Sequence, residues 1–294
     1  MIIQVEKLKK SYKKKTVLHN INIFVEEPTI VALVGPNGSG KTTLLNCMAN
    51  LLSFDEGKIR LLEKNNGDPN LFYDMSFLQD NRILYPNLTV YDHLKFVCDM
   101  QKINYSEIDH VIQRVGMQEY PKKRIKHLSL GMKQHLLLAM AIINKPKLLL
   151  LDEPFNGMDP TSSINMREIL IELFSQGTTV LVSSHNLDQI DRLTDTVLFI
   201  KNGTLLRESL KDLSSISYSL TMDDAQKTLQ LVHEKNLPVT IGSSDRLQFD
   251  SNDISLQEIL KTLHDANLQV IDIEKIKYGA EMRYQQLFEE DETS

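Results

Sequence analysis

The stretch Gly35-Pro36-Asn37-Gly38-Ser39-Gly40-Lys41-Thr42-Thr43 decides the fold of this chain, because it follows the apolar run Ile30–Val34 and opens an apolar helical segment. Its spacing, G-x-x-x-x-G-K-[ST], predicts a P-loop, in which successive backbone N–H groups face one concavity that holds phosphate oxygens. Lys41 then reaches the terminal phosphates, and the Thr42 hydroxyl suits Mg²⁺, which prefers hard oxygen ligands. The alternative, a glycine-rich turn with a surface lysine, is disfavoured by the strand before and the helix after the stretch.

Two carboxylates follow a second apolar run. Residues 148–151 are four leucines, which indicates a strand buried on both faces, and Asp152 and Glu153 come where this strand ends. Because ligands of open α/β sheets bind outside the carboxyl ends of the strands, Asp152 is placed to hold Mg²⁺ through water. Glu153 is placed to polarise a water for attack on a γ-phosphate. The plainer alternative is that two acidic residues merely end a strand.

Strand-like and helix-like segments alternate along the chain, which predicts an α/β fold, a P-loop NTPase core with a mainly parallel sheet and helices on both faces. A helical insertion is expected over about residues 83–143. Its last helix begins at Ser129, a good N-cap, and Ser129 with Gly131 would make a second anion site at the helix N-terminus. His185 follows the buried strand Thr179–Ser184 and can donate to a phosphate oxygen. An ordinary capped helix and a satisfied polar histidine are the alternatives.

An antiparallel β subdomain is expected at the N-terminus, where strands over residues 2–5 and 17–25 flank a lysine-rich turn. Tyr12 lies in this turn, and its ring can either stack on a purine or pack on the surface. A solvated hairpin explains the lysines, and a patch that faces anionic lipid headgroups is the sharper alternative. These lysines are Lys7, Lys9, Lys10, Lys13, Lys14 and Lys15.

Size and composition limit the classes of protein that the chain can belong to. Its 294 residues suffice for one large core or two domains. No apolar run approaches the roughly 18 to 20 residues that span a bilayer. The start lacks a secretory signal, and Cys47 and Cys98 fall in helix-like stretches that favour reduced thiols, so we expect a cytoplasmic protein. The net charge of −6 argues against nucleic acid as a partner, since its binding needs a surplus of Lys and Arg.

These motifs together resemble the nucleotide-binding subunit of ATP-binding cassette (ABC) transporters, and the resemblance covers a cassette domain over residues 1–205. The similar motifs are Walker A over residues 35–43, the Q-loop at Gln79, the signature over residues 128–134, Walker B over residues 148–153, the D-loop over residues 156–159 and the switch histidine at His185. The resemblance implies ATP hydrolysis with ATP and Mg²⁺ as cofactors. It implies ATP binding by Tyr12, Gly35, Pro36, Asn37, Gly38, Ser39, Gly40, Lys41, Thr42, Thr43, Ser129, Gly131 and Asp159; catalysis by Glu153, His185 and Gln79; and metal binding by Thr42, Gln79 and Asp152.

The signature stretch narrows the resemblance, because Walker motifs alone would fit many ATPases. The family's usual Leu-Ser-Gly-Gly-Gln is here Leu128-Ser129-Leu130-Gly131-Met132, which keeps the hydroxyl and the close backbone approach. A similar Ser-Leu-Gly-Met pattern is typical of cassettes that pair with separate export permeases for peptide antibiotics, drugs or ions. The resemblance therefore implies the ATPase subunit of an exporter, held on the inner face of the membrane by its permease.

The resemblance also implies partners. The family mechanism requires two cassettes that face head to tail, and this chain contains one set of motifs, so a homodimer or heterodimer is expected. An integral membrane permease would dock near Gln79 and the helical insertion. Two other functions stay open: a soluble cassette ATPase that acts on ribosomes or DNA, and a regulatory cassette that binds ATP without hydrolysing it. The single cassette and the acidic charge argue against the first, and Glu153 and His185 argue against the second.

A second, small α+β domain is expected over residues 211–290, after the cassette motifs stop. Its segments follow the order β-α-β-β-α-β, which resembles a ferredoxin-like domain, and we expect a role in dimer contact or regulation. Residues 289–292 are acidic and indicate a solvated, disordered end. The expected strands are 216–222, 238–241, 246–249 and 268–273; the expected helices are 223–235, one from Ser255 and one over 281–290.

Overall fold

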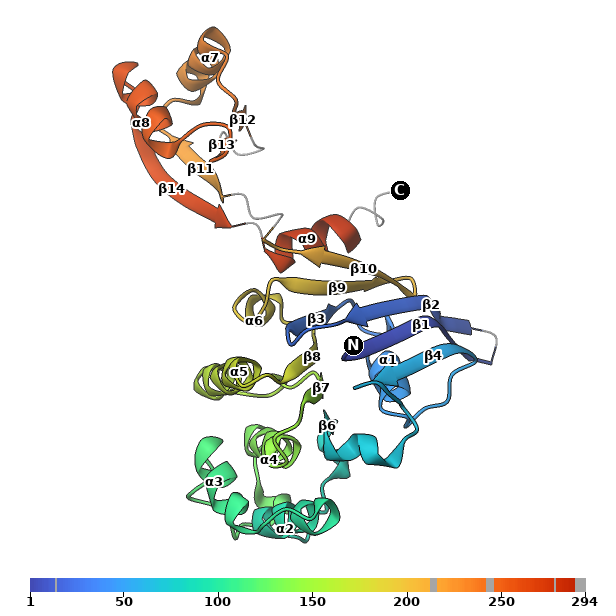
Figure 1. Cartoon of the computed structure of the whole chain (residues 1–294). Helices are drawn as coiled ribbons and strands as arrows, with labels where there is room; N and C mark the ends of the chain where they lie inside the picture. The colour runs from blue at the N-terminus through green and yellow to red at the C-terminus, as the bar shows by residue number, and fades with distance from the viewer. Residues whose placement is uncertain (14, 212–215, 242–245, 278, 289–294) are drawn as a thin grey trace. The chain divides into compact units, whose positions relative to one another are not determined.

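The computed structural model describes residues 1–13, 15–211, 216–241, 246–277 and 279–288 (Figure 1). The chain divides into two compact units, Met1–Glu208 and Ser209–Ser294. Within the described residues, no helix combines the length and the apolar character that crossing a bilayer requires.

A six-stranded sheet forms the centre of the first unit, with the strand order β10-β9-β3-β8-β7-β6. Its pairs β3–β8, β3–β9, β6–β7 and β7–β8 are parallel, as expected, and every residue of β3 and β8 is buried. Figure 1 shows α1 on one face of this sheet and α5 with α6 on the other. The elements are β3 (Ile30–Val34), β6 (Met75–Leu78), β7 (Leu148–Asp152), β8 (Thr179–Ser184), β9 (Thr196–Lys201), β10 (Thr204–Ser209), α1 (Lys41–Met48), α5 (Pro160–Ser175) and α6 (Leu187–Asp191).

An antiparallel sheet of order β2-β1-β4-β5 packs its apolar face on α1, in one core with residues of the central sheet. Its strands are β1 (Ile3–Tyr12), β2 (Lys15–Val25), β4 (Glu56–Leu61) and β5 (Lys64–Asn65). The expectation that Tyr12 lies in a turn is wrong, because Tyr12 ends β1 and pairs with Lys15. Register shifts between Val5 and Lys10 break the alternation of apolar residues, which is why the sequence pattern predicted a strand of only four residues.

The helical insertion lies between β6 and β7. Side chains cap the N-termini of two of its helices: Thr89 and Asp92 form a capping box on α2, and the Ser129 hydroxyl accepts from Met132 N on α4. The elements are η2 (Asn81–Ile83), α2 (Val90–Gln101), α3 (Ser106–Arg114), η3 (Ile125–His127) and α4 (Leu130–Ile142), and η1 (Pro69–Tyr73) precedes β6.

The second unit has the element order β-α-β-β-α-β, followed by a helix. Its antiparallel sheet has the order β12-β13-β11-β14, and helices α7 and α8 contribute Val232, Ile259 and Leu263 to its core. Strand β14 runs four residues further than expected, because its charged half alternates too weakly to be recognised. Residues 242–245 and the acidic residues 289–292 lie outside the described part. The elements are β11 (Ile216–Met222), α7 (Ala225–Lys235), β12 (Thr240–Ile241), β13 (Arg246–Asp250), α8 (Leu256–Asp265), β14 (Val270–Lys277) and α9 (Ala280–Phe288).

Candidate nucleotide-binding site

The P-loop connects β3 to α1 and depends on glycines at its two ends. A Cβ on Gly35 would lie 2.6 Å from Ile200 Cγ2 and 2.7 Å from the Ile200 carbonyl oxygen, so no side chain fits there. Gly40 has a φ of +111°, a conformation that favours glycine, and it forms the N-cap of α1. The loop therefore presents its backbone and the start of a helix at the carboxyl end of the sheet, where an anion is stabilised.

Lys41, the first residue of α1, folds back onto this loop. Its ammonium donates to the carbonyl oxygens of Gly35 at 2.7 Å and of Pro36 at 3.3 Å, and it lies 3.6 Å from Glu153 Oε1. The side chain is only 6% exposed. A buried ammonium needs such partners, because burying an unpaired charge is costly. Phosphate oxygens that enter the loop would compete for this same charge.

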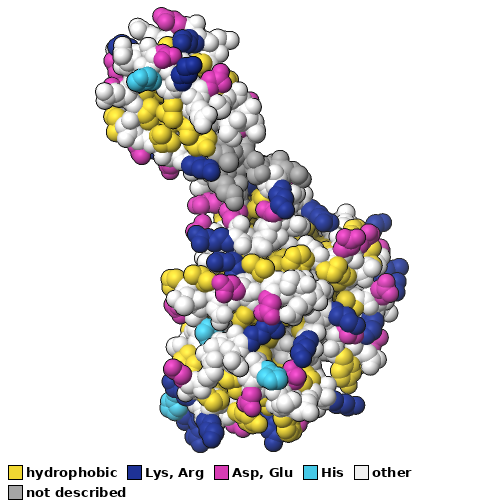
Figure 2. Space-filling view, turned by 60° about the vertical axis from the view of Figure 1, so that its left-hand side comes forward, with side chains coloured by type: hydrophobic (Ala, Val, Ile, Leu, Met, Phe, Trp, Pro, Cys, Tyr) yellow, Lys and Arg dark blue, Asp and Glu magenta, His cyan; other side chains and the backbone are white. Residues whose placement is uncertain are grey.

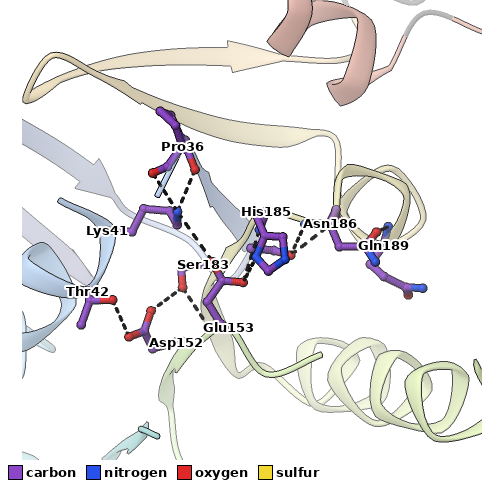
Figure 3. A network of polar contacts seen from close by, with 11 residues as sticks. Pro36, Lys41, Thr42, Asp152, Glu153, Ser183, His185, Asn186 and Gln189 are labelled. Carbon is purple, nitrogen blue, oxygen red and sulfur yellow. Dashed lines mark hydrogen bonds and ion pairs between the residues drawn. The ribbon is translucent and has the colours of Figure 1, made fainter. Parts of the chain in front are cut away.

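Asp152, the last residue of β7, joins the P-loop helix to β8. Its Oδ2 accepts a hydrogen bond of 2.8 Å from the Thr42 hydroxyl, and its Oδ1 accepts one of 2.6 Å from the Ser183 hydroxyl (Figure 3). Hydroxyl and carboxylate oxygens are ligands that Mg²⁺ prefers, so Thr42 and Asp152 fit the predicted cation.

Glu153 follows β7 in a left-handed conformation, with a φ of +49°. Such a conformation costs about 1–3 kcal/mol for a residue other than glycine and persists only where its surroundings hold it. The Ser183 hydroxyl accepts from the Glu153 backbone N–H at 3.0 Å, which supports the turn. Glu153 Oε2 then lies 2.8 Å from His185 Nδ1, so the carboxylate bridges Lys41 and His185, as Figure 3 shows.

Ser183 was missed by sequence reasoning. It lies on β8, is fully buried, and contacts both Walker B carboxylate residues: the side chain of Asp152 and the backbone of Glu153. The available signal was the pair of serines that ends an otherwise apolar strand at the same sheet edge as Asp152.

Gln79 and Tyr12 reach the site from other strands. Gln79 directly follows β6, whose last residue, Leu78, pairs with Leu151, so Gln79 emerges beside Asp152. Its amide donates to Asn46 Oδ1 on α1 at 3.4 Å. Tyr12 is 47% exposed, and the ammonium of the buried Lys10 lies 5.3 Å from its ring centroid, a cation–π contact on one face of the ring.

The signature and D-loop residues form a separate group. Ser129 caps α4, and Asp159 caps α5 by accepting from Ser162 N at 3.0 Å and from the Ser162 hydroxyl at 2.7 Å. These hydrogen bonds lower the pKa of Asp159 below its ordinary value. Gly157 has a φ of +73°, and a Cβ there would lie 2.1 Å from Leu130 Cδ2, so Leu130 packs directly on the D-loop glycine. Nothing in the sequence pattern indicated this contact.

Comparison with known proteins assigns the family. A family model described as ABC transporter matches residues 18–156, and one described as AAA domain, putative AbiEii toxin, Type IV TA system, matches residues 123–191. The chain is 37% identical over 211 residues to the lantibiotic transport ATP-binding protein SrtF of Streptococcus pyogenes, across 72% of this chain and 92% of SrtF. It is 34% identical over 211 residues to the bacitracin transport ATP-binding protein BcrA of Enterococcus faecalis, across 70% of this chain and 68% of BcrA.

Solved structures show the same fold. The structure of an ATP-binding subunit of an ABC transporter matches with a TM-score of 0.67 at 25% identity, across 72% of this chain and 92% of that one. The cassette MJ0796 bound to ADP and phosphate matches with a TM-score of 0.66 at 23% identity, across 71% and 98%. With this fold, and with its identity to SrtF over nearly all of that protein, the chain belongs to the ABC transporter family as an ATP-binding ATPase subunit.

Proposed function

We propose that this chain hydrolyses ATP to drive export through a separate membrane permease. The observation that carries the proposal is the position of Glu153, whose carboxylate lies 3.6 Å from the Lys41 ammonium and 2.8 Å from His185 Nδ1. A base beside the residue that binds the terminal phosphates is the arrangement that phosphoryl transfer to water needs.

ATP binding would use the P-loop and Tyr12 together. The P-loop N–H groups, from Gly38 to Thr43, would hold phosphate oxygens, and Lys41 would exchange the carbonyls of Gly35 and Pro36 for the terminal phosphates. One face of the Tyr12 ring carries the Lys10 ammonium, and the other would stack on adenine. Adenine would thus be recognised by a residue of β1, and the triphosphate by the loop that follows β3.

Thr42 and Asp152 would hold Mg²⁺, with the Gln79 amide oxygen beside them. Their oxygens lie 2.8 Å apart, and both are hard donors. When bound, this cation would supply positive charge that neutralises the phosphate oxygens. Ser183 would act as a positioning residue, since its hydroxyl fixes the second oxygen of Asp152.

Hydrolysis would depend on Glu153 and His185. The Glu153 carboxylate takes a proton from a water as the water oxygen bonds to the γ-phosphorus and the bond to the ADP oxygen breaks. His185 positions this carboxylate through its ring nitrogen and its backbone N–H, which lies 3.3 Å from Oε2. Because His185 is 53% exposed, its ring is also accessible to a γ-phosphate oxygen, to which it can donate.

A second cassette would complete each site. Ser129 and Gly131 start a capped helix whose N-terminus suits an anion, and Asp159 starts another. Among the described residues, the side chains of Ser129 and Asp159 bond to their own helices and not to their own P-loop. We therefore place them opposite the P-loop of a partner cassette, head to tail. The same chain can supply both halves, so a homodimer is the simpler assembly, and a heterodimer is its alternative.

A cavity beside Gln79 would receive the permease. It has a volume of about 290 Å³ and is lined by Phe72, Ile83, Val97 and Met140 in addition to Gln79. An apolar helix of the permease could insert there and sense changes at the nucleotide through Gln79. The permease would hold the chain at the inner face of the membrane, and the relatives SrtF and BcrA favour a peptide antibiotic as the cargo.

The second unit would be an accessory domain. We assign residues from Ser209 onward to it and residues up to Glu208 to the cassette. Its ferredoxin-like element order, without any residue of the nucleotide site, favours a role in dimer contact or regulation rather than catalysis.

ATP turnover by the purified chain tests the proposal, with Lys41→Ala and Glu153→Gln as variants. Loss of the base would lower turnover about a hundredfold or more, whereas Glu153→Gln would still bind ATP. Glu172→Gln is the matched control, because Glu172 pairs with Arg114 on the far helices α3 and α5. We expect turnover to rise more than linearly with protein concentration, as dimers form.

Undiminished turnover in Glu153→Gln would overturn the assignment of the base. ATP binding without turnover in the wild-type chain, at any concentration, would contradict a self-sufficient homodimer. It would point to a second, different cassette or to a permease that is required for activity.

A further inference from the structure

Two segments of the helical insertion run side by side: residues 85–91, a turn that leads into α2, and residues 121–127, a turn that leads into η3. The backbone N–H groups of Ile125 and Lys126 donate to Leu88 and Pro86, and those of Val90 and Tyr91 donate back to Lys123 and Pro121, at 2.9–3.2 Å. Thr89 and Arg124 form an antiparallel bridge between them. Ile125 is 2% exposed and anchors the pair in the core. We call residues 85–91 with 121–127 the insertion ribbon.

The insertion ribbon is strongly basic. Lys122, Lys123, Arg124 and Lys126 are all exposed, and Glu119 is the one acidic residue between positions 118 and 127. Among the side-chain hydrogen bonds and ion pairs of the described residues, none involves any of these four cations. The residues that the structure describes therefore leave this positive charge without an ion-pair partner, although the chain carries a net charge of −6.

Exposed apolar side chains accompany these cations. Tyr85 is 64% exposed, Leu88 40% and Tyr91 38%, and all three belong to the segment over residues 85–91 that pairs with the basic one. Figure 2 shows Lys and Arg side chains next to hydrophobic ones at the lower end of the larger unit, where the helical insertion lies. Tyrosines and lysines together suit the boundary between lipid headgroups and hydrocarbon, where the ring is partly buried and the charge meets phosphate.

We propose that the insertion ribbon binds anionic phospholipid headgroups and so holds the helical insertion against the membrane surface. Mobile, singly charged lysines make up three of its four cations, which suits a fluid array of phosphates better than one fixed carboxylate. The ribbon is continuous with α2, which also contributes Val97 to the cavity assigned to the permease. Lipid contact there would add to the attachment that the permease provides, without replacing it.

The other basic stretch of the chain lacks these properties. In the N-terminal hairpin, Lys9 pairs with Glu56 at 2.7 Å, and Lys10 is buried over the Tyr12 ring. Its exposed lysines include Lys7, Lys13 and Lys15, and the exposed ring beside them, Tyr12, already carries the Lys10 ammonium on one face. This hairpin supplies a control with the same change of charge.

Vesicle sedimentation of the purified full chain tests the proposal. The vesicles are phosphatidylcholine with about a third of phosphatidylglycerol, and pure phosphatidylcholine is the neutral comparison. We expect the triple variant Lys122→Gln, Lys123→Gln, Lys126→Gln to bind the anionic vesicles about a hundredfold more weakly, from about a fivefold effect of each lysine. The control variant Lys7→Gln, Lys13→Gln, Lys15→Gln is expected to bind as the wild type does. ATP turnover of both variants in solution should equal that of the wild type and shows that they are folded.

Any of four results would overturn the proposal. The wild type would fail to bind the anionic vesicles, or it would bind neutral vesicles equally well, or both variants would lose binding to the same extent. Tighter binding of soluble polyglutamate than of vesicles at equal charge concentration, lost in the ribbon variant, would instead assign the surface to an acidic protein segment. Each of these results leaves the ATPase and permease proposals intact, because the assay measures lipid binding by the chain alone.

Discussion

The two regions that we propose to carry the nucleotide chemistry of this cassette are built in different ways. On the P-loop side, the Glu153 carboxylate contacts both Lys41 and His185, which come from different elements of the same chain. On the signature side, Ser129 and Asp159 accept hydrogen bonds from their own helices and are exposed. The first region is a connected array within one chain, whereas the second presents helix N-termini outward. This difference is the structural argument for the proposed head-to-tail dimer, in which the second region serves the site of a partner.

Mixing two inactive variants tests this difference between the two regions, and it has the largest expected effect. Lys41→Ala removes the P-loop charge, and Ser129→Arg blocks the signature helix, so either variant alone should lose turnover by about tenfold or more. In an equal mixture, about half of the dimers contain one chain of each kind and have one intact site. Turnover should therefore return to about a quarter of the wild-type value if the two sites act independently. Phosphate release after mixing measures this recovery.

The recovery also serves as a control on folding, because the Ser129→Arg chain must supply a working P-loop. A mixture of two different P-loop variants, Lys41→Ala and Thr42→Ala, should stay inactive, since none of its dimers has an intact P-loop. If the first mixture gains nothing while each variant dimerises normally, the two regions act within one chain and the head-to-tail arrangement is wrong.

The sequence predicts those parts of the site whose residues are close together along the chain. The P-loop spacing, the leucine strand before Asp152 and the strand before His185 were all readable, because burial on both faces makes each strand a continuous apolar run. The sequence could not show that β8 lies between β3 and β7. That order brings Ser183 within 2.6 Å of Asp152, although 31 positions separate them. Ser183 was missed for this reason.

The β structure shows the same limit. Strand β1 was expected to end near Val5, and it continues to Tyr12 through lysines whose alternation is broken by register shifts. The element order of the second unit was readable, because helix caps such as Ser255 act locally, but the length of β14 depends on pairing with β11. Local chemistry thus predicts which elements form, and pairing between distant segments decides how far they extend.

The packing of Leu130 on Gly157 gives the next sharpest test of the signature side. Gly157→Ala forces a Cβ to within 2.1 Å of Leu130 Cδ2 and places alanine at a φ of +73°. We expect the free energy of unfolding to fall by about 1–3 kcal/mol. In a Leu130→Ala background the clash is absent. There, Gly157→Ala should lower the free energy of unfolding by at least about 0.5 kcal/mol less than it does with Leu130 present. Urea unfolding of the four proteins measures this coupling.

Gly116→Ala is the matched control for backbone strain, since Gly116 has a φ of +75° and a Cβ there would meet nothing within 4 Å. It should lower stability equally in both backgrounds. Equal costs of Gly157→Ala with and without Leu130 would show that the leucine moves aside freely. The signature helix and the D-loop would then not be coupled through this contact.

The smallest expected effect concerns Asp159, whose pKa is lowered chiefly by the side-chain and backbone hydrogen bonds from Ser162 at the start of α5. Because the folded value lies below the ordinary 3.8, the charged cap stabilises the fold above that pH, and this contribution is lost as the pH falls through the folded pKa. Asp159→Asn keeps an N-cap without the charge, so its melting temperature should lie slightly below that of the wild type at neutral pH and converge with it in acid.

Asp92→Asn, at the capping box of α2, offers the comparison on a helix outside the signature group, where the pKa is lowered by Thr89. A gap between wild type and Asp159→Asn that stays constant from neutral pH into acid would mean that the charge of Asp159 contributes nothing to its cap.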